Sequence, residues 1–342
     1  MIVFSTIFQS SVEELSTNYY LSYDLDHQQI MYSSNIHEPI APASLTKIMT
    51  AIILLDNYDI NDYIEVKIIN NDIKGKIAYI ESNQSMKVST LLDFLLVYSA
   101  NDAAHVAALA VSETESEFID LMNSKASYLG MSNTNYVNVH GLDEDAHYTT
   151  LNDLLILTLE SIKYDAIIAS VRKDSFVASI NNNIPTTYKT TNDLILYNQN
   201  YIGLKTGWTS KAGLTLIALY QESNRNVLTI VNKSEVNQDK TNHFNDTEIL
   251  TLTSINNYKL INIVNKDDVL LNIYSGQGYY PIYSTVDITE FDNIKVQKTI
   301  NLESIDNNQA TYKYHDNKQV NVPIPKSNKI SILNSLIFWL FK

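Results

Sequence analysis

The sequence predicts a mixed α/β fold in which a sheet is flanked by helices, followed by a small all-β domain. Alternating segments at residues 19–23 and 28–32, joined by an Asp-Leu-Asp-His turn, predict a first pair of strands. A long helical block follows, and strand-like segments return after residue 200. Strands on both sides of a helical block are typical of a sheet covered by helices.

The first expected helix follows Pro42, since proline favours the start of a helix and an almost wholly apolar run continues to Leu55. A polar stretch at residues 64–88 has a β-like pattern. Further helices are expected at residues 91–98, 103–113, 117–129 and 151–163. A strand through Lys205 and a hairpin of residues 214–220 with 227–231 come next.

We expect residues 17–258 to form the main domain and residues 259–325 a small β domain. The β domain is expected because long helices give way to short alternating segments, at residues 269–274, 294–300 and 310–314. Its role is expected to be that of a spacer or a protein-interaction module.

The two ends of the chain bear on location. Residues 1–16 are expected to be the remnant of a signal peptide, because their apolar run is too short for a complete one. Residues 326–342 are expected to form an amphipathic tail. As a helix its apolar part would be roughly 18 Å long, short of the ~30 Å membrane core, which favours binding at the membrane surface. Docking of the tail on the β domain is the alternative.

The composition argues against several classes of function. The formal charge of −14 opposes contact with a phosphate backbone, so no nucleic-acid partner is expected. None of the seven histidines falls in a metal-ligand spacing and there is no cysteine, so no metal is expected. Because there is no glycine-rich phosphate loop either, no cofactor is expected.

The most informative pattern is Ser-x-x-Lys at Ser44 and Lys47, where the apolar run begins. On a helix this spacing puts the hydroxyl and the amine on one face, close enough for the lysine to take the proton of the serine. The same pattern recurs at Ser170 and Lys173, so spacing alone proves little. The setting favours the first copy, because polar groups at the start of a buried helix are costly unless they are used.

Two further motifs supply the other parts of an acyl-transfer site. Ser99 and Asn101, in a Ser-Ala-Asn motif, lie between two apolar helical segments, where a short loop can aim both side chains into a cleft. Lys205, Thr206 and Gly207 follow a strand-like segment. They offer an ammonium and a hydroxyl to a substrate carboxylate, and the glycine lets a ligand approach the backbone.

Together these motifs resemble those of the D-alanyl-D-alanine carboxypeptidases of the S11 peptidase family, which are low-molecular-mass penicillin-binding proteins. The likeness extends over residues 42–50, 99–104 and 203–209, and over a fourth block from residue 129 to 150. The resemblance implies an α+β fold of the β-lactamase/transpeptidase type, with an antiparallel sheet flanked by helices.

The resemblance also assigns roles. Ser44 is the expected nucleophile and Lys47 its general base, kept partly neutral by burial and by the cation of Lys205. Ser99 is expected to relay the proton to the leaving group, and Asn101 to hold the substrate backbone.

On the strand that carries the third motif, Lys205 and Thr206 are expected to hold the terminal carboxylate of the substrate. The amides of Ser44 and Trp208, the residue after Gly207, are expected to form the oxyanion hole. The indole of Trp208 is expected at the rim of the cleft.

Histidines and a missing arginine complete the expected site. His140 is expected at the edge of the substrate site, although a loop histidine bonded to nearby backbone is equally compatible with its position. His147 is expected to be structural. Relatives often carry an arginine downstream of the third motif; this chain has none there, and Lys240 or His243 lies in the corresponding region.

The predicted function is that of a serine D-Ala-D-Ala carboxypeptidase that removes the terminal D-alanine of peptidoglycan pentapeptide stems through an acyl-enzyme and is acylated by β-lactam antibiotics. The alternatives are a D,D-endopeptidase, a β-lactamase and a non-catalytic β-lactam or peptidoglycan sensor. A class A β-lactamase is disfavoured, because that class has Ser-Asp-Asn where this chain has Ser-Ala-Asn. Since the polymer lies outside the cytoplasm, an extracytoplasmic protein attached to the membrane is expected.

Overall fold

The computed structural model describes residues 12–67, 73–181, 184–222 and 225–264, and six further strands between residues 269 and 323, with side chains described up to residue 258. The chain divides into two compact units, residues 1–255 and 256–342. Among the described helices, none has both the length and the apolar character needed to cross a membrane. Residues 1–11 of the expected signal remnant, and the whole expected tail, lie outside the described residues.

The first unit is built on a five-stranded antiparallel sheet with the order β2-β1-β9-β8-β7. Its strands are β1 (Tyr19–Asp24), β2 (Gln29–Ser34), β7 (Tyr201–Thr209), β8 (Gly213–Glu222) and β9 (Arg225–Ser234). Pairing of β1 with β9 joins the N-terminal hairpin to the other three strands of this sheet, with Tyr20 opposite Val231. The antiparallel sheet predicted from the sequence is confirmed.

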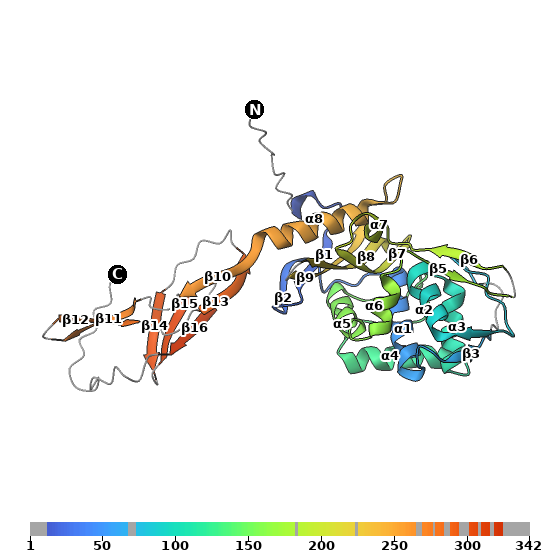
Figure 1. Cartoon of the computed structure of the whole chain (residues 1–342), viewed down its shortest axis with the longest axis horizontal. Helices are drawn as coiled ribbons and strands as arrows, with labels where there is room; N and C mark the ends of the chain where they lie inside the picture. Colours follow the sequence, from blue (N-terminus) through green and yellow to red (C-terminus); the bar gives the residue numbers. More distant parts are fainter. Residues whose placement is uncertain are drawn as a thin grey trace, which may run out of the picture. The chain divides into compact units, whose positions relative to one another are not determined.

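Helix α8 (Asn242–Asn257) lies on one face of this sheet (Figure 1). The hydroxyls of Thr229 and Thr251 lie 2.8 Å apart, and Ser254 donates to Ser22 at 2.7 Å, so hydroxyl groups tie the helix to β9 and β1. This helix is not predicted from the sequence, because hydroxyl side chains stand among its buried residues where an apolar stripe is usual.

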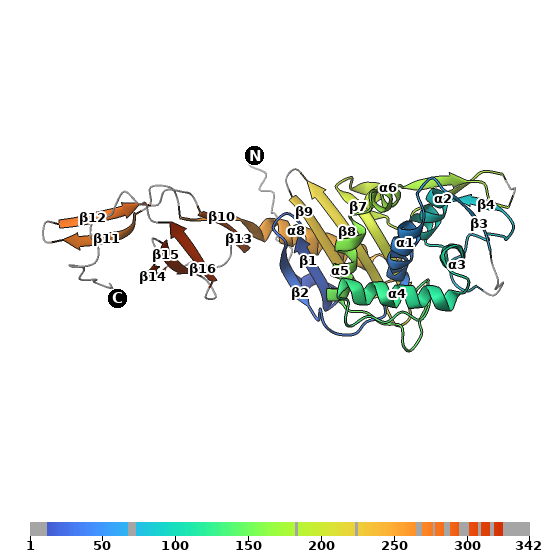
Figure 2. The same ribbon diagram turned by 90° about the horizontal axis from the view of Figure 1, so that it is seen from below.

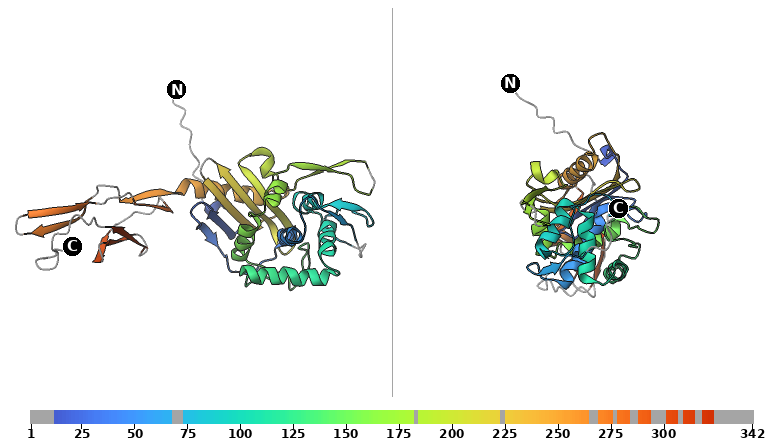
Figure 3. Two further views of the ribbon diagram at one scale, coloured as in Figure 1. Left: turned by 60° about the horizontal axis from the view of Figure 1, so that its bottom comes forward. Right: turned by 90° about the vertical axis from the view of Figure 1, so that its right-hand side faces the viewer.

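The opposite face is covered by a helical layer centred on α1 (Thr46–Asn57) (Figure 2). The other helices of this layer are α2 (Val88–Asp93), α3 (Asn101–Val111), α4 (Glu115–Leu129), α5 (Leu151–Ser161) and α6 (Asp165–Val171). Helix α4 lies on the side of α1 that faces away from the sheet (Figures 2 and 3). The predicted helices at residues 103–113, 117–129 and 151–163 are confirmed by α3, α4 and α5.

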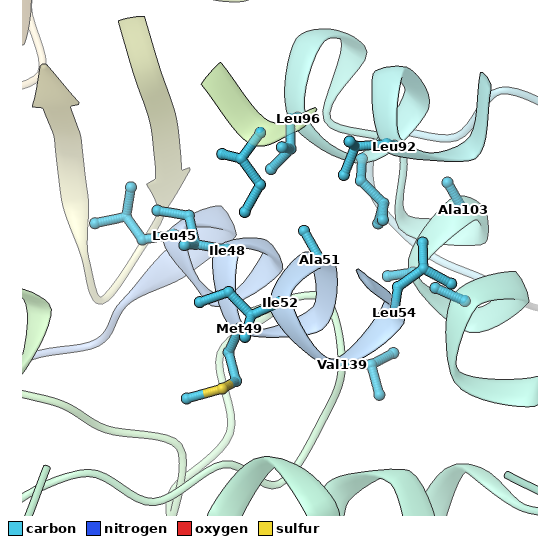
Figure 4. Packing of buried hydrophobic residues seen from close by; sticks show 14 of the residues in the cluster. Leu45, Ile48, Met49, Ala51, Ile52, Leu54, Leu92, Leu96, Ala103 and Val139 are labelled. Carbon is cyan, nitrogen blue, oxygen red and sulfur yellow. The ribbon is translucent and has the colours of Figure 1, made fainter. Parts of the chain in front are cut away.

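Helix α1 is buried on all sides, from Thr46 to Leu54. Figure 4 shows its apolar side chains packed among Leu92, Leu96, Ala103 and Val139, which come from the surrounding helices and from a loop. Each fully buried leucine or isoleucine of such a cluster contributes about 1.5–3 kcal/mol to folding. A helix held in this way on every side fixes the position of the residues at its N-terminal end.

The helix predicted at residues 91–98 begins earlier, at Val88, and changes character before it ends. From Phe94 to Tyr98 the chain forms a π-helical turn, and Ser99 ends it with φ of 67°, in the left-handed region. Helix α3 starts two residues later, at Asn101. π-Turns of this kind occur frequently at functional sites, and here the turn places Ser99 at the junction of two helices.

The β-like pattern at residues 64–88 gives strands only at its two ends, so the prediction of a β-stretch is wrong for most of the described part. Between these ends, the backbone N–H groups of Ala78 and Ile80 donate to the carboxylate of Asp102, all at 3.0 Å. The segment 73–84 is thus held by a buried side chain in place of a neighbouring strand. The short strands of the unit are β3 (Tyr63–Glu65) with β4 (Ser85–Lys87), and β5 (Ser175–Ala178) with β6 (Thr186–Lys189).

From Tyr258 onward, all the described elements are strands. They form three small antiparallel sheets: β10 (Tyr258–Val264) with β13 (Ile288–Asn293), β11 (Val269–Ser275) with β12 (Gly278–Tyr283), and β14 (Asn301–Asp306) with β15 (Gln309–Tyr314) and β16 (Lys318–Pro323). The predicted strands at residues 269–274 and 310–314 are confirmed. The segment predicted at residues 294–300 lies outside the described residues.

Candidate active site

A cavity of about 560 Å³ in the first unit brings together residues from all three sequence motifs. Its lining includes Ser44, Ser99, Asn101, Thr206, Gly207 and Trp208. The first comes from the turn that precedes α1, the next two from the junction of the π-turn with α3, and the last three from β7. Residues more than 150 positions apart in the chain therefore meet around one space.

Ser44 and Lys47 are in direct contact. The Nζ of Lys47 lies 2.9 Å from the Oγ of Ser44 and also 2.9 Å from the carbonyl oxygen of His140. Lys47 has no exposed surface, and burial lowers the pKa of its amine to about 7; the carboxylate of Asp102 opposes this shift and the cation of Lys76 adds to it. A substantial fraction of the amine is therefore neutral near pH 7, as a general base requires.

The backbone before Ser44 is held in an unusual conformation. Ala43 has φ of 49°, in the left-handed region, and the hydroxyl of Thr46 donates to its carbonyl at 2.9 Å. The Nε2 of His147 lies 2.9 Å from the same hydroxyl, while its Nδ1 accepts from the N–H of Val137 at 3.1 Å. His147 thus has the structural position that the sequence analysis expects, and burial lowers its pKa to about 4.

Two glycines allow other segments to approach this turn. A Cβ atom on Gly141, where φ is +92°, would lie 1.8 Å from the carbonyl oxygen of Ala43. A Cβ atom on Gly207 would lie 2.9 Å from the Cβ of Ala43 and 3.1 Å from the amide nitrogen of Ser44. The backbone of β7 therefore passes directly beside the nitrogen of Ser44, the approach that an oxyanion site made by Ser44 and Trp208 needs.

Asn101 is anchored to the segment 73–84 by two hydrogen bonds. Its backbone N–H donates to the carbonyl of Lys76 at 2.7 Å, and its side-chain Nδ2 donates to the carbonyl of Lys74, also at 2.7 Å. The next residue, Asp102, binds the same segment through its carboxylate. The second motif and this segment therefore form one wall of the cavity.

Lys205 lies in the middle of β7 and is almost completely buried. Its Nζ donates to the carbonyl of Thr206 at 2.9 Å. Burial, with the cations of Lys47 and Lys76 adding to it, holds the pKa of Lys205 well below its usual value. The sequence predicts that the cation of Lys205 helps to keep Lys47 neutral. In the structure Lys76 is the cation that lowers the pKa of Lys47, and Lys47 in turn lowers the pKa of Lys205.

The far end of β7 carries an aromatic side chain at the cavity. The hydroxyl of Thr206 lies 2.6 Å from that of Thr191, and the half-exposed Trp208 has the Nζ of Lys240 at 3.9 Å from its ring centroid. Lys240 and His243 both line the cavity, so both residues that the sequence offers in place of the arginine reach it.

The imidazole of His140 does not line the cavity; Gly141 and Leu142 do. Its Nδ1 accepts from the N–H of Leu142 at 3.1 Å, and the ring stands 5.2 Å from that of His105. Burial lowers the pKa of His140 to about 3, with Lys47 and the two neighbouring histidines acting in the same direction. Its contribution to the site in this structure is the backbone carbonyl that accepts from Lys47.

Several lining residues, among them Lys76, Thr191 and Asp193, are absent from the sequence predictions. They lie in segments without a motif, and only the fold brings them to the cavity. Within the described ranges, no three histidine, aspartate or glutamate side chains are grouped as metal ligands would be.

Comparison with known proteins identifies the family. The family model described as D-alanyl-D-alanine carboxypeptidase, S11 peptidase, matches residues 6–235. The chain is 30% identical over 211 residues to the D-alanyl-D-alanine carboxypeptidase DacF of Bacillus subtilis, covering 60% of this chain and 54% of DacF. It is 28% identical over 232 residues to DacA of Escherichia coli, covering 64% and 57%. The chain thus spans little more than half the length of these relatives.

Solved structures agree with this likeness. Penicillin-binding protein D2 from Listeria monocytogenes, in its cefotaxime-bound form, is 26% identical, with a TM-score of 0.62 over 70% of this chain and 98% of that one. The carboxypeptidase DacD from Francisella tularensis is 19% identical and shares the fold, with a TM-score of 0.72 over 92% of this chain and 94% of that one. The predicted transpeptidase-like fold is confirmed.

Proposed function

We propose that this chain, which belongs to the S11 family of D-alanyl-D-alanine carboxypeptidases, is a serine carboxypeptidase that removes the terminal D-alanine from peptidoglycan pentapeptide stems. The observation that carries the proposal is the 2.9 Å contact between the buried amine of Lys47, with a pKa of about 7, and the hydroxyl of Ser44. A neutral amine at this distance can take the hydroxyl proton, which makes Ser44 a nucleophile.

In the first step, the Oγ of Ser44 attacks the carbonyl carbon between the two D-alanines while its proton passes to Lys47. The amides of Ser44 and Trp208 would stabilise the negative oxygen that forms; loss of one such donor typically costs about 10²- to 10³-fold in rate. The carbon–nitrogen bond then breaks, and the proton reaches the leaving amine through Ser99. Free D-alanine departs, and the rest of the peptide stays esterified to Ser44.

In the second step, a water molecule attacks the ester and Lys47 accepts its proton. Cleavage of the ester bond releases the shortened peptide and restores the hydroxyl of Ser44. Asn101 would hold the peptide backbone of the acyl part throughout.

Recognition of the substrate terminus falls to Lys205 and Thr206. A carboxylate bound beside the buried Lys205 would favour the charged form of its amine and so offset the lowering of its pKa. His140 would act through its carbonyl, as a partner of Lys47. Lys240, close to Trp208, would take the part of the missing arginine at the outer end of the cavity.

The same site would react with β-lactam antibiotics, because their strained amide offers a carbonyl to Ser44 and their separate carboxylate can bind Lys205. A D,D-endopeptidase acting on cross-links is a second candidate, since a D-alanyl-D-alanine endopeptidase of Escherichia coli is 30% identical over 229 residues. A β-lactamase or a non-catalytic sensor would use the same acylation and differ in how fast the ester is hydrolysed.

The substrate polymer implies an extracytoplasmic location, with residues 326–342 attaching the protein to the membrane surface. Deletion of these residues should release the protein from membranes in fractionation and leave peptidase activity unchanged. Membrane association that persists after the deletion would count against the tail as the anchor.

Intact-protein mass spectrometry with a penicillin, followed by an assay for D-alanine release from a diacyl-Lys-D-Ala-D-Ala peptide, tests the proposed activity. Acylation at Ser44 together with release is expected. Acylation without release would favour the endopeptidase or the sensor, and rapid loss of the penicilloyl group would favour the β-lactamase. Absence of both acylation and release would contradict the proposal.

A further inference from the structure

One cation at the cavity is given no contact with the substrate in the reaction proposed above. Lys76 lines the cavity together with the motif residues, and its Nζ lies 4.0 Å from the centroid of the Tyr98 ring. A cation over an aromatic face is attracted by the ring, so Tyr98 restricts the positions that the long side chain occupies.

The backbone of Lys76 is fixed as well. Its carbonyl accepts from the N–H of Asn101 at 2.7 Å, and two residues further on the carboxylate of Asp102 holds the N–H of Ala78. The backbone of Lys76 therefore has a defined place beside Asn101, and both residues line the cavity.

The charges around Lys76 favour an anion. Among the described residues no carboxylate lies within ion-pair distance of its Nζ; the recorded ion pairs involve other residues. The carboxylate of Asp102 is occupied by backbone N–H groups. Lys47 and Lys205 are close enough for Lys76 to lower the pKa of each. Lys76 and Lys240 bring two ammonium groups to the lining of the cavity and Asp193 brings one carboxylate, so the net charge of the lining favours an anionic ligand.

We propose that Lys76 binds a second carboxylate of the substrate, on the side chain of the residue that precedes the D-Ala-D-Ala unit, and so selects acidic stem peptides. The proposal rests on the function given above, in which Lys205 takes the terminal carboxylate and Asn101 holds the acyl part of the peptide. Because the backbone of Lys76 is bonded to Asn101, and Asn101 holds the acyl part of the peptide, the group that Lys76 meets belongs to the acyl part.

The test uses two peptides that end in D-Ala-D-Ala and differ only in the preceding side chain, which carries a carboxylate in one and the corresponding carboxamide in the other. The native protein should show a kcat/KM about three- to tenfold higher for the carboxylate peptide, the range of an ion pair that keeps some contact with water. In Lys76→Met this preference should disappear, while Lys76→Arg should retain most of it.

Lys74→Met is the matched control. Lys74 is a lysine of the same segment whose side chain is exposed and does not line the cavity, so its variant should keep the full preference. Acylation of Ser44 by benzylpenicillin reports on folding in each variant. A penicillin with an additional carboxylate on its acyl side chain should acylate the native protein faster relative to benzylpenicillin than it acylates Lys76→Met.

Equal kcat/KM for the two peptides in the native protein would overturn the role of Lys76 and leave the proposed function intact. A preference that survives in Lys76→Met would overturn it too, even if both rates fell together, since that result indicates a positioning role alone. Absence of D-alanine release from both peptides, with no acylation of Ser44, would instead contradict the proposed function.

Discussion

Two regions of this molecule carry the same Ser-x-x-Lys pattern and use it differently. At the start of α1, the amine of Lys47 contacts Ser44 directly, and the other recorded partner of the amine is a neutral carbonyl. At the end of α6, Ser170 donates to Asp93 at 2.8 Å and Lys173 lies 2.6 Å from the same carboxylate. In the second copy the hydroxyl and the ammonium therefore both bind the carboxylate of Asp93, and the contact is structural.

The difference lies in the surroundings and not in the spacing. The carboxylate of Asp93 forms an ion pair with Lys173, and it also accepts the hydrogen bond of the Ser170 hydroxyl. Lys47 is buried without an ion-pair partner among the described residues, so its neutral form is favoured. A Ser-x-x-Lys pattern becomes a candidate for acyl transfer where the lysine is buried and no carboxylate forms an ion pair with it.

The largest effect is expected from removing the hydroxyls. Ser44→Ala should lower covalent labelling by a penicillin by about 10³-fold or more, because no other group replaces the nucleophile. Ser170→Ala, the matched control, should be labelled like the native protein. Labelling rates from intact-protein mass spectrometry give the comparison, and labelled Ser44→Ala would move the nucleophile elsewhere.

The lysines should separate activity from stability. Lys47→Met should lower the acylation rate by about 10²- to 10⁴-fold, the usual contribution of a general base, and should leave the thermal midpoint largely unchanged. Lys173→Met should leave acylation unchanged but lower the free energy of unfolding by about 1–3 kcal/mol, since Asp93 loses a charged partner. Urea titration and acylation kinetics measure the two quantities, and the reverse pattern would contradict the distinction between the two pairs.

A smaller effect is expected at the buried cation of β7. Lys205→Ala should lower kcat/KM for peptides with a free terminal carboxylate by about 10- to 100-fold, because a charge-assisted hydrogen bond to the substrate is lost. For a peptide whose terminal carboxylate is amidated, the same substitution should lower kcat/KM much less. Equal losses for the two peptides would show that Lys205 acts on the fold or on Lys47 and not on the carboxylate.

The smallest effect concerns pH. Because the neutral amine of Lys47 is the base, acylation should rise with pH through about 7 and level off above it. Lys76→Met removes a neighbouring cation, so the pKa of Lys47 and the acid limb of the profile should shift upward by less than about one pH unit. The profile of Lys173→Met should coincide with that of the native protein. A downward shift in Lys76→Met would contradict the assigned electrostatics.

Most of the fold and the motif residues were predictable, because both rest on local pattern. Apolar periodicity marked α3, α4 and α5, and the three motifs marked Ser44, Asn101 and Lys205. Helix α8 was not predicted, since threonine and serine on its buried side gave no apolar stripe and are moderate helix formers.

The features of the structure that could not be predicted from the sequence depend on long-range contacts. The segment 73–84 looked β-like, yet the carboxylate of Asp102 holds it, and a bond between residues 24 positions apart has no local signature. For the same reason Lys76 was not assigned to the site. The side chain of His140 was expected at the substrate edge by resemblance, but the local bond from the N–H of Leu142 to its ring turns it elsewhere.

The crowding around Ala43 has a consequence for mutational tolerance. In a saturation library, most substitutions at Gly141 or Gly207 would push against the backbone on which Ser44 stands, so few variants at these positions should keep the nucleophile aligned. Gly130, with nothing within 4 Å of an added Cβ, should accept asparagine far more readily. Variants selected for weaker labelling by β-lactams should therefore accumulate in the segment 73–84, where the wall of the cavity can change without moving the serine.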